Sequence, residues 1–213
     1  MRPLVSGKQR ALFHAKRKNE EAVISEQYRM IGTNIHFIVG DKKSNAILVT
    51  SPRKREGKSA TAANIAVTMA QQGNEVLLID ANFRNPAMHK IFNTPNIFGF
   101  TDVLDGNVTF EDAVSFPKVN GLHILTSGTV PLNLTGQRAG ELLDSVKASY
   151  NMVIIDSPSL LEANDSKILA NICDGVVLVV KQNATSIESA LESKKILNYA
   201  QAKLLGVVLN EKN

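Results

Sequence analysis

Residues 45–60 read NAILVTSPRKREGKSA. Within this stretch, residues 46–49 form a short apolar run, which is typical of a strand buried inside a sheet. Residues 59–72 form an Ala-rich segment of helical character that stops at Gly73, and glycine commonly ends a helix. The stretch therefore predicts a buried strand, a charged loop and the start of a helix, and we expect the rest of the chain to be organised around it.

The charged loop ends in Gly57, Lys58 and Ser59, the core of a Walker A motif. In such a motif the glycine lets backbone N–H groups close on phosphate oxygens, the lysine reaches the β- and γ-phosphates, and the serine hydroxyl ligates Mg²⁺. The following helix adds the positive end of its dipole. The strict motif has glycine where this chain has Pro52, so the tripeptide alone indicates only a surface turn. The strand before it and the helix after it favour a nucleotide site.

Length and composition indicate one folded domain. The 213 residues fit one α/β domain with an N-terminal extension, and the 44% hydrophobic content is ordinary for a globular protein. The single cysteine, Cys173, excludes an internal disulfide and suits a reducing compartment. No apolar run approaches the roughly 20 residues of a membrane-spanning helix, and the N-terminus lacks the apolar core of a signal peptide. We therefore expect a cytoplasmic protein.

Positive charge is concentrated at the N-terminus. Residues 1–18 contain six basic residues and no acidic one, whereas the whole chain carries +4, so the remainder carries a net charge of −2. A basic tail can contact anionic lipid or nucleic acid, and the alternative is a solvated, disordered arm. Because Phe13 is the only aromatic residue interleaved with these charges, we do not expect nucleic-acid binding.

Apolar runs and helical segments alternate along the chain. Ser25 is a candidate N-cap for an amphipathic helix whose apolar residues recur as far as Ile38. Runs of the buried-strand type cover residues 75–80, 122–126, 150–156, 175–180 and 204–209, and helical patterns cover residues 135–149 and 185–200. This alternation predicts an α/β fold with a largely parallel sheet that helices cover on both faces.

Two of these predicted strands end in an aspartate, at Asp80 and Asp156. An acid at a strand end can be a helix N-cap, and for either aspartate alone this alternative stays open. Open α/β sheets, however, bind ligands at the carboxyl ends of their strands, where both acids and the Gly-Lys-Ser loop are expected to meet. The combination favours Asp156 as a Walker B acid that holds Mg²⁺, and Asp80 as a metal partner or proton acceptor.

With these motifs in order, the sequence resembles the bacterial tyrosine kinases (BY-kinases) of capsule and exopolysaccharide biosynthesis, which are relatives of the MinD and ParA P-loop ATPases. The similarity extends from about residue 24 to residue 210. Its four motifs are the self-association motif at residues 26–32, Walker A at 54–59, Walker A′ at 80–84 and Walker B at 156–159. Residues 1–22 contain Pro3 and Gly7 and show no sustained period, so we expect a flexible basic extension there. The resemblance implies a P-loop kinase-like domain over residues 23–213.

The resemblance also implies an activity, ATP-dependent protein-tyrosine phosphorylation with Mg²⁺. It assigns catalytic roles to Lys58, Asp80 and Asp156, and it assigns metal coordination to Ser59, Asp80 and Asp156. Asn210 follows the last strand and is expected to contact the adenine. The full set of expected ATP-binding residues is Arg53, Lys54, Arg55, Glu56, Gly57, Lys58, Ser59, Ala60 and Asn210.

Partners follow from the same resemblance. Such kinases work beside a membrane protein that governs polysaccharide chain length and activates them, which would place this protein at the inner face of the membrane. Their protein substrates carry tyrosines. The self-association motif implies a homo-oligomer that forms through Glu26 and Arg29. The chain's own tyrosines, Tyr28, Tyr150 and Tyr199, are expected to pack within the fold.

Three residues depart from the family pattern. Arg55 replaces a glycine of the phosphate loop, and a positive φ there would cost roughly 1–2 kcal/mol. Asn82 replaces the second acid of Walker A′ and brings no negative charge to a metal, and Gly32 replaces the second arginine of the self-association motif. Arg53 occupies the place of the signature lysine of MinD, where it either assists phosphate binding or is a solvated charge. These departures leave two alternatives, a catalytically weakened nucleotide-binding regulator or a MinD/ParA-like ATPase.

Overall fold

Strands and helices alternate along the computed structural model, which describes residues 7–40, 43–129 and 134–211. The strands are β1 (Asn45–Thr50), β2 (Val76–Asp80), β3 (Val114–Ser115), β4 (Leu122–Leu125), β5 (Met152–Asp156), β6 (Gly175–Lys181) and β7 (Leu204–Asn210). The helices are α1 (Gly7–Val39), α2 (Lys58–Gln71), α3 (Met88–Ile91), α4 (Phe100–Leu104), α5 (Phe110–Ala113), α6 (Gly136–Val146), α7 (Asp165–Ile172) and α8 (Ile187–Tyr199). The predicted α/β fold is confirmed.

The strands form one sheet in the order β3-β4-β2-β5-β1-β6-β7. All pairs are parallel except β3 with β4. The six predicted strands are therefore confirmed, and the short antiparallel β3 is the strand that the sequence patterns missed. A strand of two residues is too short to show any periodicity.

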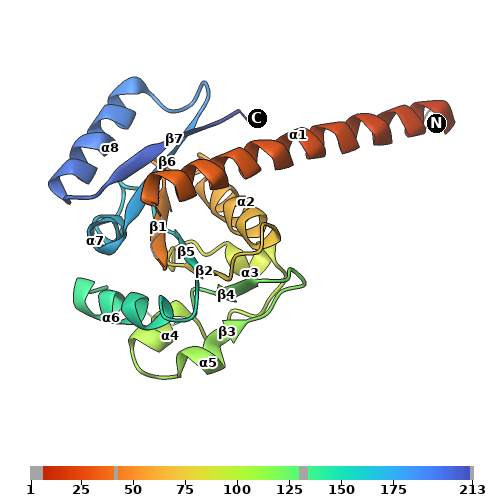
Figure 1. The fold of residues 1–213 in the computed structure, drawn as a ribbon. Helices are drawn as coiled ribbons and strands as arrows, with labels where there is room; N and C mark the ends of the chain where they lie inside the picture. The colour runs from red at the N-terminus through yellow and green to blue at the C-terminus, as the bar shows by residue number, and fades with distance from the viewer. Residues whose placement is uncertain (1–6, 41–42, 130–133, 212–213) are drawn as a thin grey trace.

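Helices cover both faces of the sheet, as Figure 1 shows, with α1, α2 and α3 on one side and α6, α7 and α8 on the other. The side chains of β1 pack against the helices on both faces of the sheet. Ala46 and Leu48 belong to the core under the second group of helices, while Ile47 and Val49 belong to the core under the first group. Because successive side chains of a strand point to opposite faces, a continuous apolar run is needed where both faces are covered.

The long helix α1 packs on the sheet through α2. Ile35 and Val39 of α1 lie in the same core as Met69 of α2. Gly32 is buried at this contact, and a Cβ at that position would lie 3.3 Å from Met69 Cγ. The glycine that departs from the family's arginine pattern therefore allows α1 and α2 to approach closely.

Helix α1 begins earlier than the sequence patterns predicted. The predicted N-cap at Ser25 is wrong, because α1 already begins at Gly7. Residues 1–6 of the predicted extension lie outside the described residues, and residues 7–22 are helical. These residues are rich in Ala, Lys, Arg and Glu and contain no proline, so their intrinsic propensity favours a helix even without apolar periodicity. The N-terminal part of α1 extends away from the body of the molecule (Figure 1), and the division into an extension of residues 1–22 and a domain of residues 23–213 stays a prediction.

We expect Gly32→Arg to lower the free energy of unfolding by about 1–3 kcal/mol, because the new side chain would have to push Met69 and Gln72 aside. Thr33→Arg is the matched control, since Thr33 is exposed and the substitution adds the same charge to the same helix. Urea denaturation of both variants measures the difference. Equal stability of the two variants would contradict the close packing of α1 on α2.

Candidate functional site

The register of three neighbouring strands brings the predicted site together. Val49 of β1 lies opposite Asp156 of β5, and Asp156 lies opposite Asp80 of β2. The phosphate loop follows β1 directly, so the loop and both aspartates meet at the carboxyl ends of adjacent parallel strands. This is the edge at which open α/β sheets bind ligands.

Lys58 and Asp156 face each other inside this edge. The Lys58 Nζ atom lies 3.7 Å from Asp156 Oδ1 and donates a hydrogen bond of 3.1 Å to Ser59 Oγ. Asp156 is fully buried, and within the described residues neither of its carboxylate oxygens has a hydrogen-bond partner. A buried carboxylate of this kind is costly unless a charge or a metal compensates it, which fits a site that a cation completes.

Burial has a direct effect on the protonation of this acid. Desolvation raises the pKa of Asp156 to about 7, Lys58 opposes the rise and the nearby Asp80 adds to it. The carboxylate therefore exchanges its proton near neutral pH, and a Mg²⁺ ion that requires the ionised form would bind better as the pH rises.

The phosphate loop has the backbone of an anion-binding site. Gly57 has φ 96°, and a Cβ on it would overlap the side-chain amide of Asn210, whose Nδ2 donates to the Glu56 carbonyl at 3.0 Å. Within the described residues the backbone N–H groups of Arg55, Glu56 and Gly57 donate no hydrogen bond. Such N–H groups at the start of α2 are available to phosphate oxygens. The predicted contact of Asn210 with adenine stays a prediction.

Glu56 is buried and makes hydrogen bonds that the sequence analysis did not predict. Its carboxylate accepts hydrogen bonds from the backbone N–H of Arg53, at 2.7 Å, and from the hydroxyl of Thr185. Thr185 in turn accepts from the backbone N–H of Lys181 at 2.8 Å. The phosphate loop is thus tied to the connection between β6 and α8, and no local sequence signal marks a contact between residues so far apart.

Asp80 has a different environment from Asp156. Its carboxylate accepts hydrogen bonds from the backbone N–H groups of Ala87, Met88 and Asn82, at 2.8, 2.9 and 3.1 Å respectively. The side-chain amide of Asn82 donates to the Asn85 carbonyl at 3.0 Å. Asp80 therefore organises the Walker A′ loop in addition to facing the site, and Asn82 uses a donor that an ionised aspartate would not have.

Other predicted nucleotide-binding residues lie on the outside of the loop. Arg53 Nε donates to Ser189 Oγ of α8 at 3.3 Å, and Lys54 Nζ pairs with Glu162 Oε2 at 3.3 Å. Ala60 is exposed in the first turn of α2. The side chains of Arg53 and Lys54 thus contact neighbouring elements, while the backbone of the loop forms the cradle.

The condition that the sequence analysis attached to Arg55, a positive φ, is met in the structure. Its φ is 61°, in the left-handed region where glycine carries no penalty. The arginine is retained there at the expected cost of roughly 1–2 kcal/mol.

Metal binding would rest on few protein ligands. The described residues contain no group of three or more His, Cys, Asp and Glu side chains that would hold a metal by themselves. The Ser59 hydroxyl and the Asp156 carboxylate, which accepts no hydrogen bond among the described residues, fit the usual Mg²⁺ arrangement of P-loop proteins. Phosphate oxygens and water supply the remaining ligands in that arrangement.

The predicted oligomerisation residues lie on α1, away from the nucleotide loop. Arg29 Nε donates to Glu26 Oε2 at 2.7 Å, and both side chains are more than half exposed. Of the three tyrosines, Tyr150 is buried and Tyr28 packs at the edge of the core. The prediction that Tyr199 packs within the fold is wrong, since it is 88% exposed as the last residue of α8, whereas Leu197 on the same helix is buried.

Comparison with known proteins agrees with this geometry. Residues 47–213 match the family described as the CobQ/CobB/MinD/ParA nucleotide binding domain. The chain is 43% identical over 192 residues to Tyrosine-protein kinase YwqD of Bacillus subtilis (strain 168), a match that covers 88% of this chain and 81% of the relative. The chain belongs to the bacterial tyrosine-protein kinase family.

Solved structures support the same assignment of this kinase. The chimerical protein CapA2B2 is 35% identical, with a TM-score of 0.82 over 88% of this chain and 84% of that chain. The kinase domain of Escherichia coli tyrosine kinase ETK is 26% identical, with a TM-score of 0.83 over 87% of this chain and 74% of that chain. The predicted family and fold are confirmed. No helix among the described residues is long and apolar enough to cross a membrane.

We expect Asn82→Asp to lower the free energy of unfolding by about 1–3 kcal/mol, because the new carboxylate loses the bond to the Asn85 carbonyl and lies buried beside Asp80. Asn85→Asp is the matched control, as Asn85 is exposed in the same loop. Denaturation in urea without nucleotide measures both. A fully stable Asn82→Asp variant would show that the amide is not needed to hold the loop.

We expect Asp156→Asn to stabilise the free protein at pH 8. The pKa of about 7 in the folded protein lies above the ordinary aspartate value of 3.8, so ionisation costs stability progressively as the pH rises between these values. Removing the charge should therefore raise the free energy of unfolding by roughly 2–4 kcal/mol at pH 8 and by clearly less at pH 5. Asp144→Asn, at an exposed position of α6, should show no such pH dependence. A gain that is the same at both pH values would contradict the raised pKa.

Proposed function

We propose that this protein is an ATP- and Mg²⁺-dependent protein-tyrosine kinase that acts in the regulation of capsular or exopolysaccharide biosynthesis. The observation that carries the proposal is the buried Asp156 carboxylate, which lies 3.7 Å from the Lys58 ammonium and has no hydrogen-bond partner among the described residues. Similarity to proteins named tyrosine-protein kinases supports tyrosine as the acceptor. No single residue of the site selects tyrosine by itself.

The residues divide the work of binding and catalysis. Lys58 would neutralise charge on the β- and γ-phosphates, and the N–H groups of Arg55, Glu56 and Gly57 would bind phosphate oxygens. Ser59 and Asp156 would hold Mg²⁺, which neutralises charge on the phosphates when it is bound. Catalysis would consist mainly of positioning and charge neutralisation.

The transfer itself needs an acceptor and a place for a proton. The tyrosine oxygen would attack the γ-phosphorus, and the bond to the bridging oxygen would break so that ADP leaves with that electron pair. The hydroxyl proton would pass to a carboxylate at the carboxyl ends of β2 and β5, where Asp80 lies opposite Asp156. We assign Asp80 the role of metal partner or proton acceptor, because three backbone donors hold its orientation.

We propose a membrane polysaccharide co-polymerase as the activating partner. A solved relative is a chimerical protein named CapA2B2, and a further relative is named as the putative tyrosine-protein kinase CapB. Binding to such a partner would hold this kinase at the inner face of the membrane, in the cytoplasm. The exposed Glu26 and Arg29 of α1 are the surface that we propose for homo-oligomerisation.

The test is ATP binding and tyrosine phosphorylation by the full chain, with the cytoplasmic segment of the activating partner and Mg²⁺. Lys58→Met is expected to lower the phosphorylation rate at least about 100-fold, since it removes the charge that stabilises the transferred phosphoryl group. Lys90→Met, at an exposed position of α3, is the control and should retain wild-type activity. ATP binding without any phosphotyrosine would instead indicate a nucleotide-binding regulator, and failure to bind ATP would overturn the nucleotide site.

A further inference from the structure

Cationic side chains surround the entrance to the site on its outer side. Arg53, Lys54 and Arg55 lie on the phosphate loop, and Arg84 lies on the Walker A′ loop. We call these four residues the basic rim. All of them are exposed, whereas Lys58 in the same loop is buried. The charge of the rim therefore faces solvent, separate from the lysine that serves the phosphates.

Two acidic residues of the β5–α7 segment lie among these cations, and both are paired. Glu162 pairs with Lys54, and Asp165 accepts hydrogen bonds from Arg84 at 3.2 and 3.1 Å. These contacts place the phosphate loop, the start of α7 and the Walker A′ loop side by side around the entrance. The four residues of the basic rim and the two acidic residues paired with them together carry a net charge of +2.

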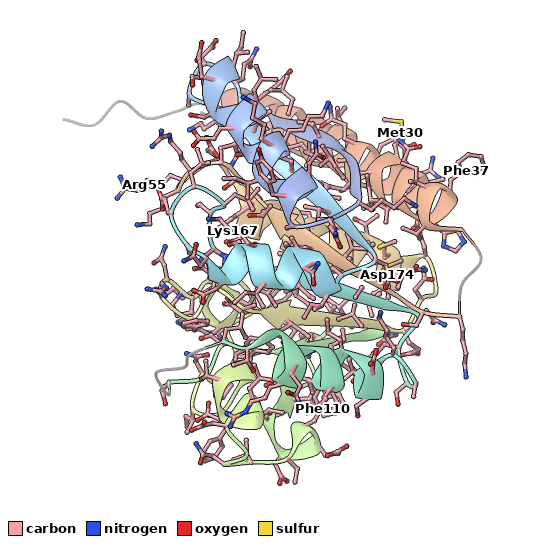
Figure 2. All side chains as sticks on the ribbon, turned by 90° about the vertical axis from the view of Figure 1, so that its left-hand side faces the viewer. Met30, Phe37, Arg55, Phe110, Lys167 and Asp174 are labelled. Carbon is pink, nitrogen blue, oxygen red and sulfur yellow. The ribbon has the colours of Figure 1, made fainter. Side chains whose placement is uncertain are left out.

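Arg55 is the cation of the rim that has no protein partner. Within the described residues it makes no hydrogen bond or ion pair, and its backbone is strained at φ 61°. Figure 2 shows its side chain projecting from the edge of the molecule, beyond the ribbon of the loop. Strained backbone positions cluster at active sites and ligand clamps. A strained, unpaired, outward-facing cation at the entrance of an active site is suited to an external anion.

We propose that the basic rim binds acidic residues that flank the acceptor tyrosine of a protein substrate. This inference rests on the proposed kinase function. The tyrosine must reach the buried edge between Lys58, Asp80 and Asp156, so the residues on either side of it cross the loops that carry the rim. In an extended peptide, residues up to three positions away lie within about 10 Å of the tyrosine. The positive charge of the basic rim would also repel a substrate segment that carries lysine or arginine.

The chain's own exposed tyrosine has the opposite surroundings. Tyr199 lies in the stretch 193–204, SKKILNYAQAKL, which contains three lysines and no acidic residue. It also lies at the end of α8 remote from the phosphate loop, since the first turn of α8 contacts that loop through Ser189 and Arg53. The basic rim would repel this stretch, so the occupant that we propose is an acidic segment of a separate protein substrate.

The stretch around Tyr199 supplies a matched pair of probes. One is the fluorescein-labelled peptide of residues 193–204, and the other is the same peptide with glutamate at its three lysine positions. Fluorescence anisotropy measures their binding to the full chain loaded with Mg²⁺ and a non-hydrolysable ATP analogue. We expect the acidic peptide to bind at least about tenfold more tightly at low ionic strength, and the ratio to approach one in about 0.5 M salt.

Substitutions at Arg55 test whether the rim causes the preference. Arg55→Glu is expected to lower the ratio of the two affinities about fivefold, and Arg55→Gln, which keeps the same backbone demand, about twofold. Lys195→Glu, at an exposed position of α8, is the control that should leave the ratio unchanged. Equal binding of the two peptides, or a ratio that Arg55→Glu does not alter, would overturn the proposal.

The binding measurement does not depend on phosphoryl transfer. A preference for the acidic peptide that Arg55→Glu lowers about fivefold therefore supports the basic rim even if neither peptide becomes phosphorylated. Absence of phosphotyrosine from both peptides, in the presence of the activating partner, would count against the proposed kinase function alone. The two proposals thus fail by different observations.

Discussion

The parallel register of β1, β5 and β2 is the constraint on which the site depends. Val49 lies opposite Asp156, and Asp156 lies opposite Asp80, so the phosphate loop and two carboxylates reach the same edge of the sheet. A slip of one residue would turn each side chain to the other face. Side chains from both faces of these strands are buried in two cores, which makes such a slip costly and holds the site in place.

The site also contains a buried carboxylate that is unfavourable for the stability of the fold. Asp156 is fully buried, unbonded by any described hydrogen-bond donor and only partly compensated by Lys58. Its raised pKa reflects this cost, because burial disfavours the charged form. A carboxylate that accepts no hydrogen bond in the nucleotide-free protein can bind a cation. The protein therefore gives up some stability at the position where ligand binding needs an open metal ligand.

Neighbouring elements hold the phosphate loop in place, while the backbone N–H groups that would bind phosphate have no protein partner among the described residues. Thr185 donates to the side chain of Glu56, Asn210 donates to the Glu56 carbonyl, and Arg53 donates to Ser189. The β6–α8 connection, β7 and α8 therefore all restrain the loop. These contacts support the positive φ of Arg55 and Gly57 and leave the inner N–H groups without protein partners. The other cationic side chains of the loop are exposed whereas Lys58 is buried, which separates nucleotide binding from the proposed recognition of a protein substrate.

The sequence by itself determined the alternation of strands and helices, the Walker A loop and the two aspartates, because each depends on residues that are neighbours in the chain. The order of the strands, which places β5 between β1 and β2, was decided by tertiary structure. So were the contacts of Glu56 with Thr185 and Asn210 and the exposure of Tyr199. The physical reason is that periodicity and capping depend on residues that are close together in the chain. The contacts of Glu56 join residues more than a hundred positions apart, and they exist only after the sheet has assembled.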